Sequence, residues 1–274
     1  MIKNNYHTHT VYCNHARGTV EDMIKAAIDA GFEEIGMSDH APVIPNLGDY
    51  GEEALKLDGN MTFETAQKYI RECEECKVKY QDKIKVYTGF ETEYLPKGIE
   101  FYKKLRSMVE YLNLGVHYFE KDGKVLNSYG DITYETLEYY VEACIEGMKT
   151  GLYNTLCHPD LFMIMYKNKN GERKFDEECV KATRRLCEAT IKYNCYIEMN
   201  ANGLRDWGAK ADPSEWFYPN TDFWTIAKEY PELKIIIGAD AHNPEALTCE
   251  NLECVCKLAD KLGLKILDKM VINH

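Results

Sequence analysis

Residues 234–242 have the sequence Lys-Ile-Ile-Ile-Gly-Ala-Asp-Ala-His, and the fold prediction starts from this stretch. A run of β-branched apolar residues is typical of a buried strand. Asp240 and His242 follow the run two residues apart, so on an extended backbone their side chains point the same way. The same pattern, a short apolar run followed by acidic or histidine side chains, recurs along the chain.

Apolar runs alternate with amphipathic helical stretches over almost the whole length. Strands are predicted near 3–7, 34–38, 84–90, 112–116, 154–157, 195–199 and 234–239. Helices are predicted near 20–30, 63–80, 98–111, 134–150, 176–193, 221–229 and 246–262. Thr19 and Asp22 have the spacing of a capping box at the start of the first helix, and Gly31 stands where that helix would stop. Seven strand–helix pairs favour an α/β fold with a parallel sheet, closed or nearly closed into a barrel.

The length of 274 residues suits one α/β barrel, and we expect residues 1–274 to form a single domain. Long connections are predicted after four strands, at 41–61, 118–132, 159–174 and 200–220. Loops of this length are usually functional, and in a barrel they meet at the C-terminal ends of the strands. Whether 41–61 closes as a lid is open.

Composition narrows the class of protein. The chain is 45% apolar and 28% charged, which is ordinary for a globular protein. A net charge of −12 argues against sequence-independent binding of nucleic acid. No apolar run approaches the roughly 18 residues of a membrane span, and the first residues do not resemble a signal peptide. With 11 cysteines and no export signal, we expect a reducing compartment, the cytoplasm.

Seven of the eight histidines fall at or just after the C-terminal end of a predicted strand. A single histidine is more often a hydrogen-bonded polar residue than a ligand, but this shared position argues for a site. Imidazoles with carboxylates are ligands typical of Zn, Mn or Fe rather than of Mg or Ca. The candidate metal ligands are too many for one ion and enough for two or three: His7, His9, His15, His40, Glu91, His117, His158, Asp240 and His242.

Three divalent cations would outweigh the two carboxylates in this set and create a positive pocket in an acidic protein. Such a pocket attracts a small dianion, for example a phosphate monoester. A metal-bridging hydroxide would form near neutral pH and attack phosphorus in line. The residues thus predict a metal-dependent phosphohydrolase, with a small-molecule substrate and no nucleic-acid or membrane partner. The oligomeric state is not predicted.

The ordered motifs resemble those of the PHP (polymerase and histidinol phosphatase) superfamily. They are His7-x-His9, Ser38-Asp39-His40, Gly89-Phe90-Glu91, His117, His158-Pro159 and Gly238-Ala-Asp-Ala-His242. The stretch from His7 to Pro42 is similar to the histidinol-phosphate phosphatases of histidine biosynthesis, and the resemblance runs from residue 5 to about 245. It implies a distorted (β/α)7 TIM-like barrel and hydrolysis of L-histidinol phosphate to L-histidinol and phosphate.

The resemblance also implies a trinuclear metal centre. The family pattern places His7, His9, Glu91 and Asp240 on one ion, Glu91, His117 and His158 on a second, and His15, His40 and His242 on a third. None of these positions is replaced, so the resemblance favours an active enzyme.

Four further residues are candidates for the substrate and the chemistry. Arg205 could bind the phosphate with its planar guanidinium, and Arg17 is a weaker candidate of the same kind. Asp39 could orient a histidine ligand or protonate the leaving alkoxide. Glu93 could bind the ammonium or imidazole of histidinol, or else be a solvent-facing or supporting acid.

Other functions remain as alternatives. On the same scaffold they are a nucleotide phosphodiesterase, a phosphotyrosine phosphatase or a polymerase-linked exonuclease, although the acidic chain suits the last poorly. A noncatalytic metal-binding scaffold is a further alternative, against which the intact ligand set counts. Cys13 and Cys157 each adjoin a ligand histidine, and on an extended backbone they are expected to face away from the metals.

Overall fold

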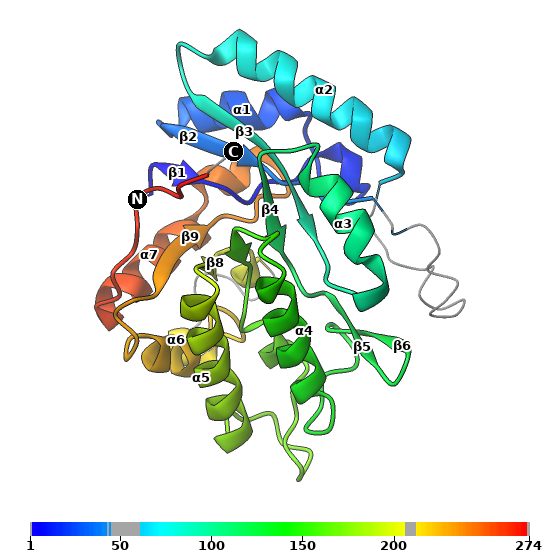
Figure 1. The fold of residues 1–274 in the computed structure, drawn as a ribbon. Helices are drawn as coiled ribbons and strands as arrows, with labels where there is room; N and C mark the ends of the chain where they lie inside the picture. The colour runs from blue at the N-terminus through cyan, green and yellow to red at the C-terminus, as the bar shows by residue number, and fades with distance from the viewer. Residues whose placement is uncertain (1, 43, 45–60, 206–211, 273–274) are drawn as a thin grey trace.

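The computed structural model describes residues 2–42, 44, 61–205 and 212–272. Within these ranges, seven parallel strands form one sheet that is nearly closed into a barrel, with helices around its outside (Figure 1). In sheet order the strands are β1 (Asn4–Asn5), β2 (Glu34–Met37), β3 (Lys85–Thr92), β4 (Tyr111–Leu114), β7 (Thr155–Leu156), β8 (Tyr196–Asn200) and β9 (Lys234–Gly238). The predicted α/β barrel is confirmed.

A helix follows each strand of the barrel, as the alternation predicts. The helices are α1 (Val20–Asp29), α2 (Phe63–Tyr80), α3 (Ile99–Arg106), α4 (Leu137–Lys149), α5 (Glu177–Lys192), α6 (Thr221–Ala227) and α7 (Glu250–Leu262). Thr19 and Asp22 form the predicted capping box of α1, and Gly31 ends that segment with φ +78°. Among the described helices, none is long and apolar enough to cross a membrane.

The barrel closes differently at its two ends. Beyond the C-terminal end of β1, Thr8 forms a parallel bridge with Ala241, which follows β9. At the other end the C-terminal segment lies between β9 and β1. There, Ile266 forms a bridge with β9, and the carbonyl of Asp268 accepts a hydrogen bond from the side chain of Asn4 at 2.8 Å. This inserted segment distorts the barrel and seals the end away from the predicted site.

Two details of the sequence prediction are wrong. The stretch 118–132 is not a plain loop, because β5 (Tyr118–Lys121) and β6 (Lys124–Asn127) form an antiparallel hairpin there. Its turn is Asp122-Gly123, with positive φ at both residues. The helix predicted over 98–111 is too long, since α3 ends at Arg106 and Tyr111 already begins β4. Most of the predicted 41–61 loop lies outside the described residues.

Candidate metal centre

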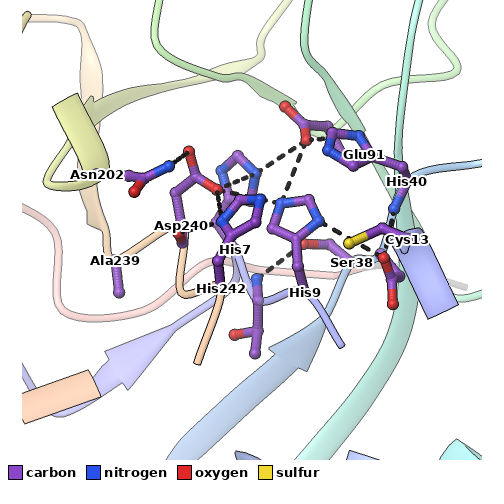
Figure 2. A network of polar contacts seen from close by, with 12 residues as sticks. His7, His9, Cys13, Ser38, His40, Glu91, Asn202, Ala239, Asp240 and His242 are labelled. Atoms are coloured by element: carbon purple, nitrogen blue, oxygen red, sulfur yellow. Dashed lines mark hydrogen bonds and ion pairs between the residues drawn. The ribbon is translucent and has the colours of Figure 1, made fainter. Parts of the chain in front are cut away.

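The nine predicted ligands all come together at the C-terminal end of the barrel. Each follows or ends a strand: His7, His9 and His15 come after β1, His40 after β2, Glu91 lies on β3, His117 follows β4, His158 follows β7, and Asp240 and His242 follow β9. Figure 2 shows the side chains of His7, His9, His40, Glu91, Asp240 and His242 around a common centre. Their ring and carboxylate atoms form several groups of three within 4.8 Å of one another.

The deepest group has the spacing of ligands on one cation. His7 Nε2 lies 3.2 Å from Glu91 Oε2 and 3.5 Å from Asp240 Oδ1. His9 Nε2 lies 3.4 Å and 3.1 Å from the same two oxygens. Tetrahedral bonds of about 2.1 Å to a zinc ion would hold neighbouring ligand atoms about 3.4 Å apart. The four side chains therefore fit a divalent cation.

Glu91 connects this group to a second one. Its other oxygen, Oε1, lies 2.8 Å from His158 Nε2 and 3.6 Å from His117 Nε2. A carboxylate with imidazoles on both oxygens can bridge two cations. The Glu91 carboxylate packs directly against Gly115. A Cβ at this position would lie 2.0 Å from Oε1, so only glycine leaves room for the carboxylate.

The remaining histidines form a third, more open group. His15 Nε2 and His242 Nε2 face each other at 3.0 Å. The ring nitrogens of His9, His40 and His242 also lie within 4.8 Å of one another. Two imidazole nitrogens this close need a shared proton or a shared cation between them.

Several buried polar atoms in the cup have no hydrogen-bond partner among the described residues. These atoms are His7 Nε2, both ring nitrogens of His9, His158 Nδ1 and Asp240 Oδ1. An unsatisfied buried polar atom is destabilising by roughly 1–3 kcal/mol. Three of them, His7 Nε2, His9 Nε2 and Asp240 Oδ1, face one another in the cup and are explained most simply by a cation that binds there.

Four of the histidines are held from behind in the same way. In each of them Nδ1 is hydrogen-bonded at 2.9–3.0 Å. In His15 and His242 the acceptor is a backbone carbonyl, that of Cys13 and of Asp240 respectively. In His117 and His7 the acceptor is a carboxylate, that of Glu93 and of Glu198 respectively. A proton on Nδ1 leaves the lone pair of Nε2 free. The rings are thus oriented so that Nε2 faces the cup.

The electrostatics of the cup favour ionised carboxylates. Burial alone would raise the pKa of Glu91, but His7, His117 and His40 outweigh burial and hold the pKa well below its usual range. The pKa of Asp240 is lowered in the same way, chiefly by His7. Burial and the neighbouring His9 lower the pKa of His242 to about 3, so this ring is neutral at neutral pH and ready to bind a cation.

Two of the ligands sit on an unusual backbone. His158 has φ +29° and Asp240 has φ +47°, in the left-handed region that side chains other than glycine rarely adopt. Such strain is stored mostly at functional sites. Asp240 is further fixed by Asn200 and Asn202, which both donate to Oδ2 at 3.1 Å and leave Oδ1 facing the histidines.

The cup opens into a cavity of about 550 Å³. Described residues that line it are Cys13, Asn14, His15, His40, Glu91, Glu93, His117, Tyr118, Asn127, Tyr129, Asn202, Arg205, Asp240 and His242. The β5–β6 hairpin thus supplies one wall, where Tyr129 stacks parallel to His117 with ring centroids 5.9 Å apart.

The four additional candidates are placed differently. Arg205 lines the cavity, whereas Arg17 is exposed and is not among its lining residues. Asp39 is fully buried behind His9, with Oδ1 3.7 Å from His9 Nδ1, and it accepts the backbone N–H of Thr10 and of His40. That position suits orientation of ligands rather than contact with a leaving group.

Glu93 supports His117, one of the predicted ligands. One carboxylate oxygen lies 2.9 Å from His117 Nδ1, and the other accepts the backbone N–H groups of His117 and Tyr118 at 2.8 and 3.1 Å. Both oxygens are therefore engaged. The geometry favours the supporting acid among the alternatives stated for this residue, although Glu93 also borders the cavity.

The expectation that Cys13 faces away from the metals is wrong. Cys13 lies in a short 3₁₀ turn rather than on an extended backbone, and its sulfur lies within 4.8 Å of ring nitrogens of His15 and His242. Cys157 Sγ lies close to His7 and to Glu198, the carboxylate on the Nδ1 side of His7, and Cys157 is not among the residues that line the cavity. Its expected direction is therefore not contradicted.

Sequence reasoning missed Glu198, Asn200 and Tyr129. The sequence did contain a signal for Glu198 and Asn200, which are polar residues at alternate positions of an otherwise apolar strand, Tyr-Ile-Glu-Met-Asn. Buried strands of a barrel rarely hold an acid without a function for it. Tyr129 lay in a stretch predicted as loop, and its sequence gave no signal.

The comparisons with known proteins agree with this geometry. Residues 5–202 match the model of the PHP domain. The chain belongs to the PHP domain family. It is 34% identical to "Probable histidinol-phosphatase" of Schizosaccharomyces pombe, over 94% of this chain and 86% of that protein. It is 26% identical to the histidinol-phosphatase of Bacillus subtilis, over 88% of this chain and 94% of that protein.

A solved PHP-type structure shares the fold. Histidinol phosphate phosphatase from Lactococcus lactis, crystallised with zinc, L-histidinol and phosphate, superposes with a TM-score of 0.68. The two sequences are 20% identical, and the superposition covers 97% of this chain and 95% of that one. At this identity the likeness shows a shared PHP barrel.

Proposed function

We propose that this protein is a metal-dependent phosphomonoesterase that hydrolyses L-histidinol phosphate to L-histidinol and phosphate. The observation that carries the proposal is the convergence of seven imidazoles and two carboxylates on a cavity that also holds Arg205. Similarity to histidinol-phosphatases over 88–94% of the chain supports this substrate. So does the Lactococcus lactis neighbour, whose structure holds L-histidinol and phosphate.

The cup would hold three divalent ions, drawn from Zn, Mn and Fe. His7, His9, Glu91 and Asp240 would bind one, Glu91, His117 and His158 a second, and His15, His40 and His242 a third. Bound cations would lower the pKa of coordinated water and neutralise negative charge on the phosphate. The buried atoms without partners and the interatomic distances of 3.1–3.5 Å support the first of these groups most directly.

The other residues bind or position. Arg205 stabilises the charge of the phosphate oxygens from the cavity wall with bidentate hydrogen bonds. Glu93 fixes the orientation of His117, and Asp39, 3.7 Å from His9 Nδ1, anchors the backbone of Thr10 and His40 on either side of the cup. Tyr129, stacked on His117 at the mouth, offers an aromatic face to the imidazole of the substrate. Arg17 is a weaker candidate for the phosphate, because it lies outside the cavity lining.

The setting of the reaction follows from charge and composition. With a net charge of −12 the surface repels nucleic acid, so the substrate is a small molecule that enters the positive cup. We expect the enzyme to work in the cytoplasm as part of histidine biosynthesis.

The test is phosphate release from a panel of substrates with metal analysis of the same sample. L-histidinol phosphate should be hydrolysed much faster than nucleotides, phosphodiesters or phosphotyrosine. Chelation should abolish turnover, and added Zn, Mn or Fe should restore it. A wide preference for another substrate class would replace the named substrate, and activity after exhaustive removal of metal would eliminate the metal-dependent mechanism.

A further inference from the structure

Glu198 lies on β8 directly behind the histidines that face the cup. Its Oε1 and Oε2 lie 2.9 and 3.1 Å from His7 Nδ1. Oε2 also accepts the backbone N–H of His158 at 3.2 Å and the side-chain amide of Asn200 at 2.9 Å. The side chain is 1% exposed. A buried carboxylate is thus held by three donors, two of which belong to predicted metal ligands.

We propose that Glu198 is a positioning residue for the metal centre. Its carboxylate keeps His7 in the tautomer with the proton on Nδ1, which leaves the lone pair of Nε2 for a cation. Nε2 lies 3.2 Å from Glu91 Oε2 and 3.5 Å from Asp240 Oδ1, and it has no hydrogen-bond partner among the described residues. The inference rests on the proposed function, since it requires that His7 binds metal.

An acid is needed at this position because a carboxylate only accepts hydrogen bonds. In Glu198→Gln the amide group would face either His7 Nδ1 or the donors of His158 and Asn200. Asn200 cannot simply reverse its own amide, because its Oδ1 accepts the N–H of Asn202 at 2.8 Å. An amide facing His7 would make Nδ1 an acceptor and move the ring proton to Nε2, where it excludes a cation.

Gly238 on β9 makes room for this carboxylate. A Cβ at Gly238 would lie 1.7 Å from Glu198 Oε1 and 2.4 Å from its carboxyl carbon. Glycine is therefore required here by close approach. Gly238→Ala should push the carboxylate away from His7 without changing any charge, so it perturbs the same contact by a different route.

Two measurements test the proposal on the purified full-length protein. Zinc affinity is obtained by competition with a chelating dye, and the tautomer of His7 is obtained from imidazole ¹⁵N NMR of the zinc-loaded protein. E198Q should weaken the affinity for one zinc ion roughly 10–100-fold and shift the His7 signals away from the Nδ1–H pattern. G238A should change both readouts in the same direction, and Glu198→Asp should keep the Nδ1–H pattern.

Glu34→Gln is the matched control. Glu34 is also a buried carboxylate on a barrel strand, 8% exposed, but it lies at the opposite end and accepts a hydrogen bond from Tyr6 Oη at 2.6 Å. E34Q should leave zinc affinity and the His7 signals unchanged, which separates positioning of the metal centre from a general effect of losing a buried charge.

The possible outcomes distinguish the role of Glu198 from the proposed function. Wild-type zinc affinity and wild-type His7 signals in E198Q and G238A would overturn the role of Glu198 and leave the proposed function intact. Failure of the wild-type protein to bind zinc, Mn or Fe would overturn both. If E198Q does not fold, G238A carries the test, and unfolding of both variants would make Glu198 a structural residue instead of a positioning one.

Discussion

The two ends of the barrel are made from the same strands, yet they differ in how their buried polar side chains are paired. At the N-terminal end Asn4 Oδ1 lacks a hydrogen-bond partner among the described residues, but the hydroxyl groups are paired with protein. Tyr6 Oη donates to Glu34 at 2.6 Å and accepts the N–H of Met270 at 3.2 Å. Tyr196 Oη accepts the N–H of Val271 at 2.8 Å. Tyr and Met side chains pack into a closed cluster there.

At the C-terminal end several buried polar atoms that face the cup have no hydrogen-bond partner in the described part of the chain. His7 Nε2, both ring nitrogens of His9 and Asp240 Oδ1 are buried and unsatisfied among the described residues. The sealed N-terminal end contributes stability, whereas the buried groups at the open C-terminal end are arranged to bind a ligand from outside the polypeptide. The comparison therefore divides the barrel into a stabilising end and a ligand-binding end, as is usual for barrels of this kind.

The largest effect is expected from the residue shared by two metal groups. Glu91→Gln removes the negative charge that faces His7, His40, His117 and His158, and it should lower kcat/KM at least about 1000-fold. The estimate follows because loss of metal-ion catalysis removes several kcal/mol of transition-state stabilisation. Phosphate release and metal content measure the effect, and circular dichroism should show a folded protein. More than a tenth of wild-type activity would contradict the division of roles.

A substitution at the sealed N-terminal end should lower stability and leave activity unchanged. Met270 is 2% exposed and packs among Tyr6, Tyr87, Tyr111 and Tyr196. Met270→Ala should lower the free energy of unfolding by about 2–5 kcal/mol, because it removes buried methylene groups and leaves a cavity. Urea unfolding measures this loss. Turnover per folded molecule, assayed well below the melting temperature, should match the wild type, and a loss of kcat in fully folded protein would show that the two ends are coupled.

The sequence was sufficient to predict the seven strand–helix pairs and the convergence of histidines and carboxylates. All predicted strands except 195–199 end in, or are followed by, a candidate such as His7, Glu91 or Asp240, and parallel strands necessarily bring those ends to one face. The prediction of the hairpin failed despite a usable signal, because Asp122-Gly123 lies between two short alternating segments, Tyr118–Lys121 and Lys124–Asn127.

Other features depend on contacts that no local pattern encodes. Glu198 acts on His7 across 191 residues of sequence, and Gly238 matters because the neighbouring strand brings a carboxylate against it. The direction of Cys13 depends on a 3₁₀ turn that interrupts the extended backbone. Alternation along an extended strand stops being a guide where the strand stops, which is also where this site begins.

A smaller effect is expected from Arg205, the residue on the cavity wall that we propose binds phosphate. Arg205→Ala should lower kcat/KM roughly 10–100-fold, since hydrogen bonds to charged groups contribute about 1.5–3 kcal/mol. Steady-state kinetics with L-histidinol phosphate measure the loss. Arg17→Ala should have less effect, and Arg184→Ala, on the exposed face of α5 where it pairs with Glu229, is the control and should have none. Wild-type kinetics in Arg205→Ala would remove Arg205 from the site.

The last effect concerns the protons bound in the open end. Burial lowers the pKa of His117, but Glu91 and Glu93 outweigh it and raise the pKa to about 9 in the metal-free protein. Below pH 9 this ring carries a proton that must leave before Nε2 can bind a cation, so zinc affinity should rise about tenfold per pH unit from pH 7 and flatten near pH 9.

Calorimetry in buffers of different ionisation enthalpy counts the protons released on zinc binding. Glu93→Gln removes one of the charges that raise the pKa of His117, so the affinity should flatten at a lower pH in this variant. Asp39, which faces His9 instead, provides the comparison: Asp39→Asn should leave the pH dependence near 9 in place. A zinc affinity independent of pH between 7 and 9 would mean that His117 is neutral without metal or does not bind it, and the open end would then hold fewer cations than its histidines suggest.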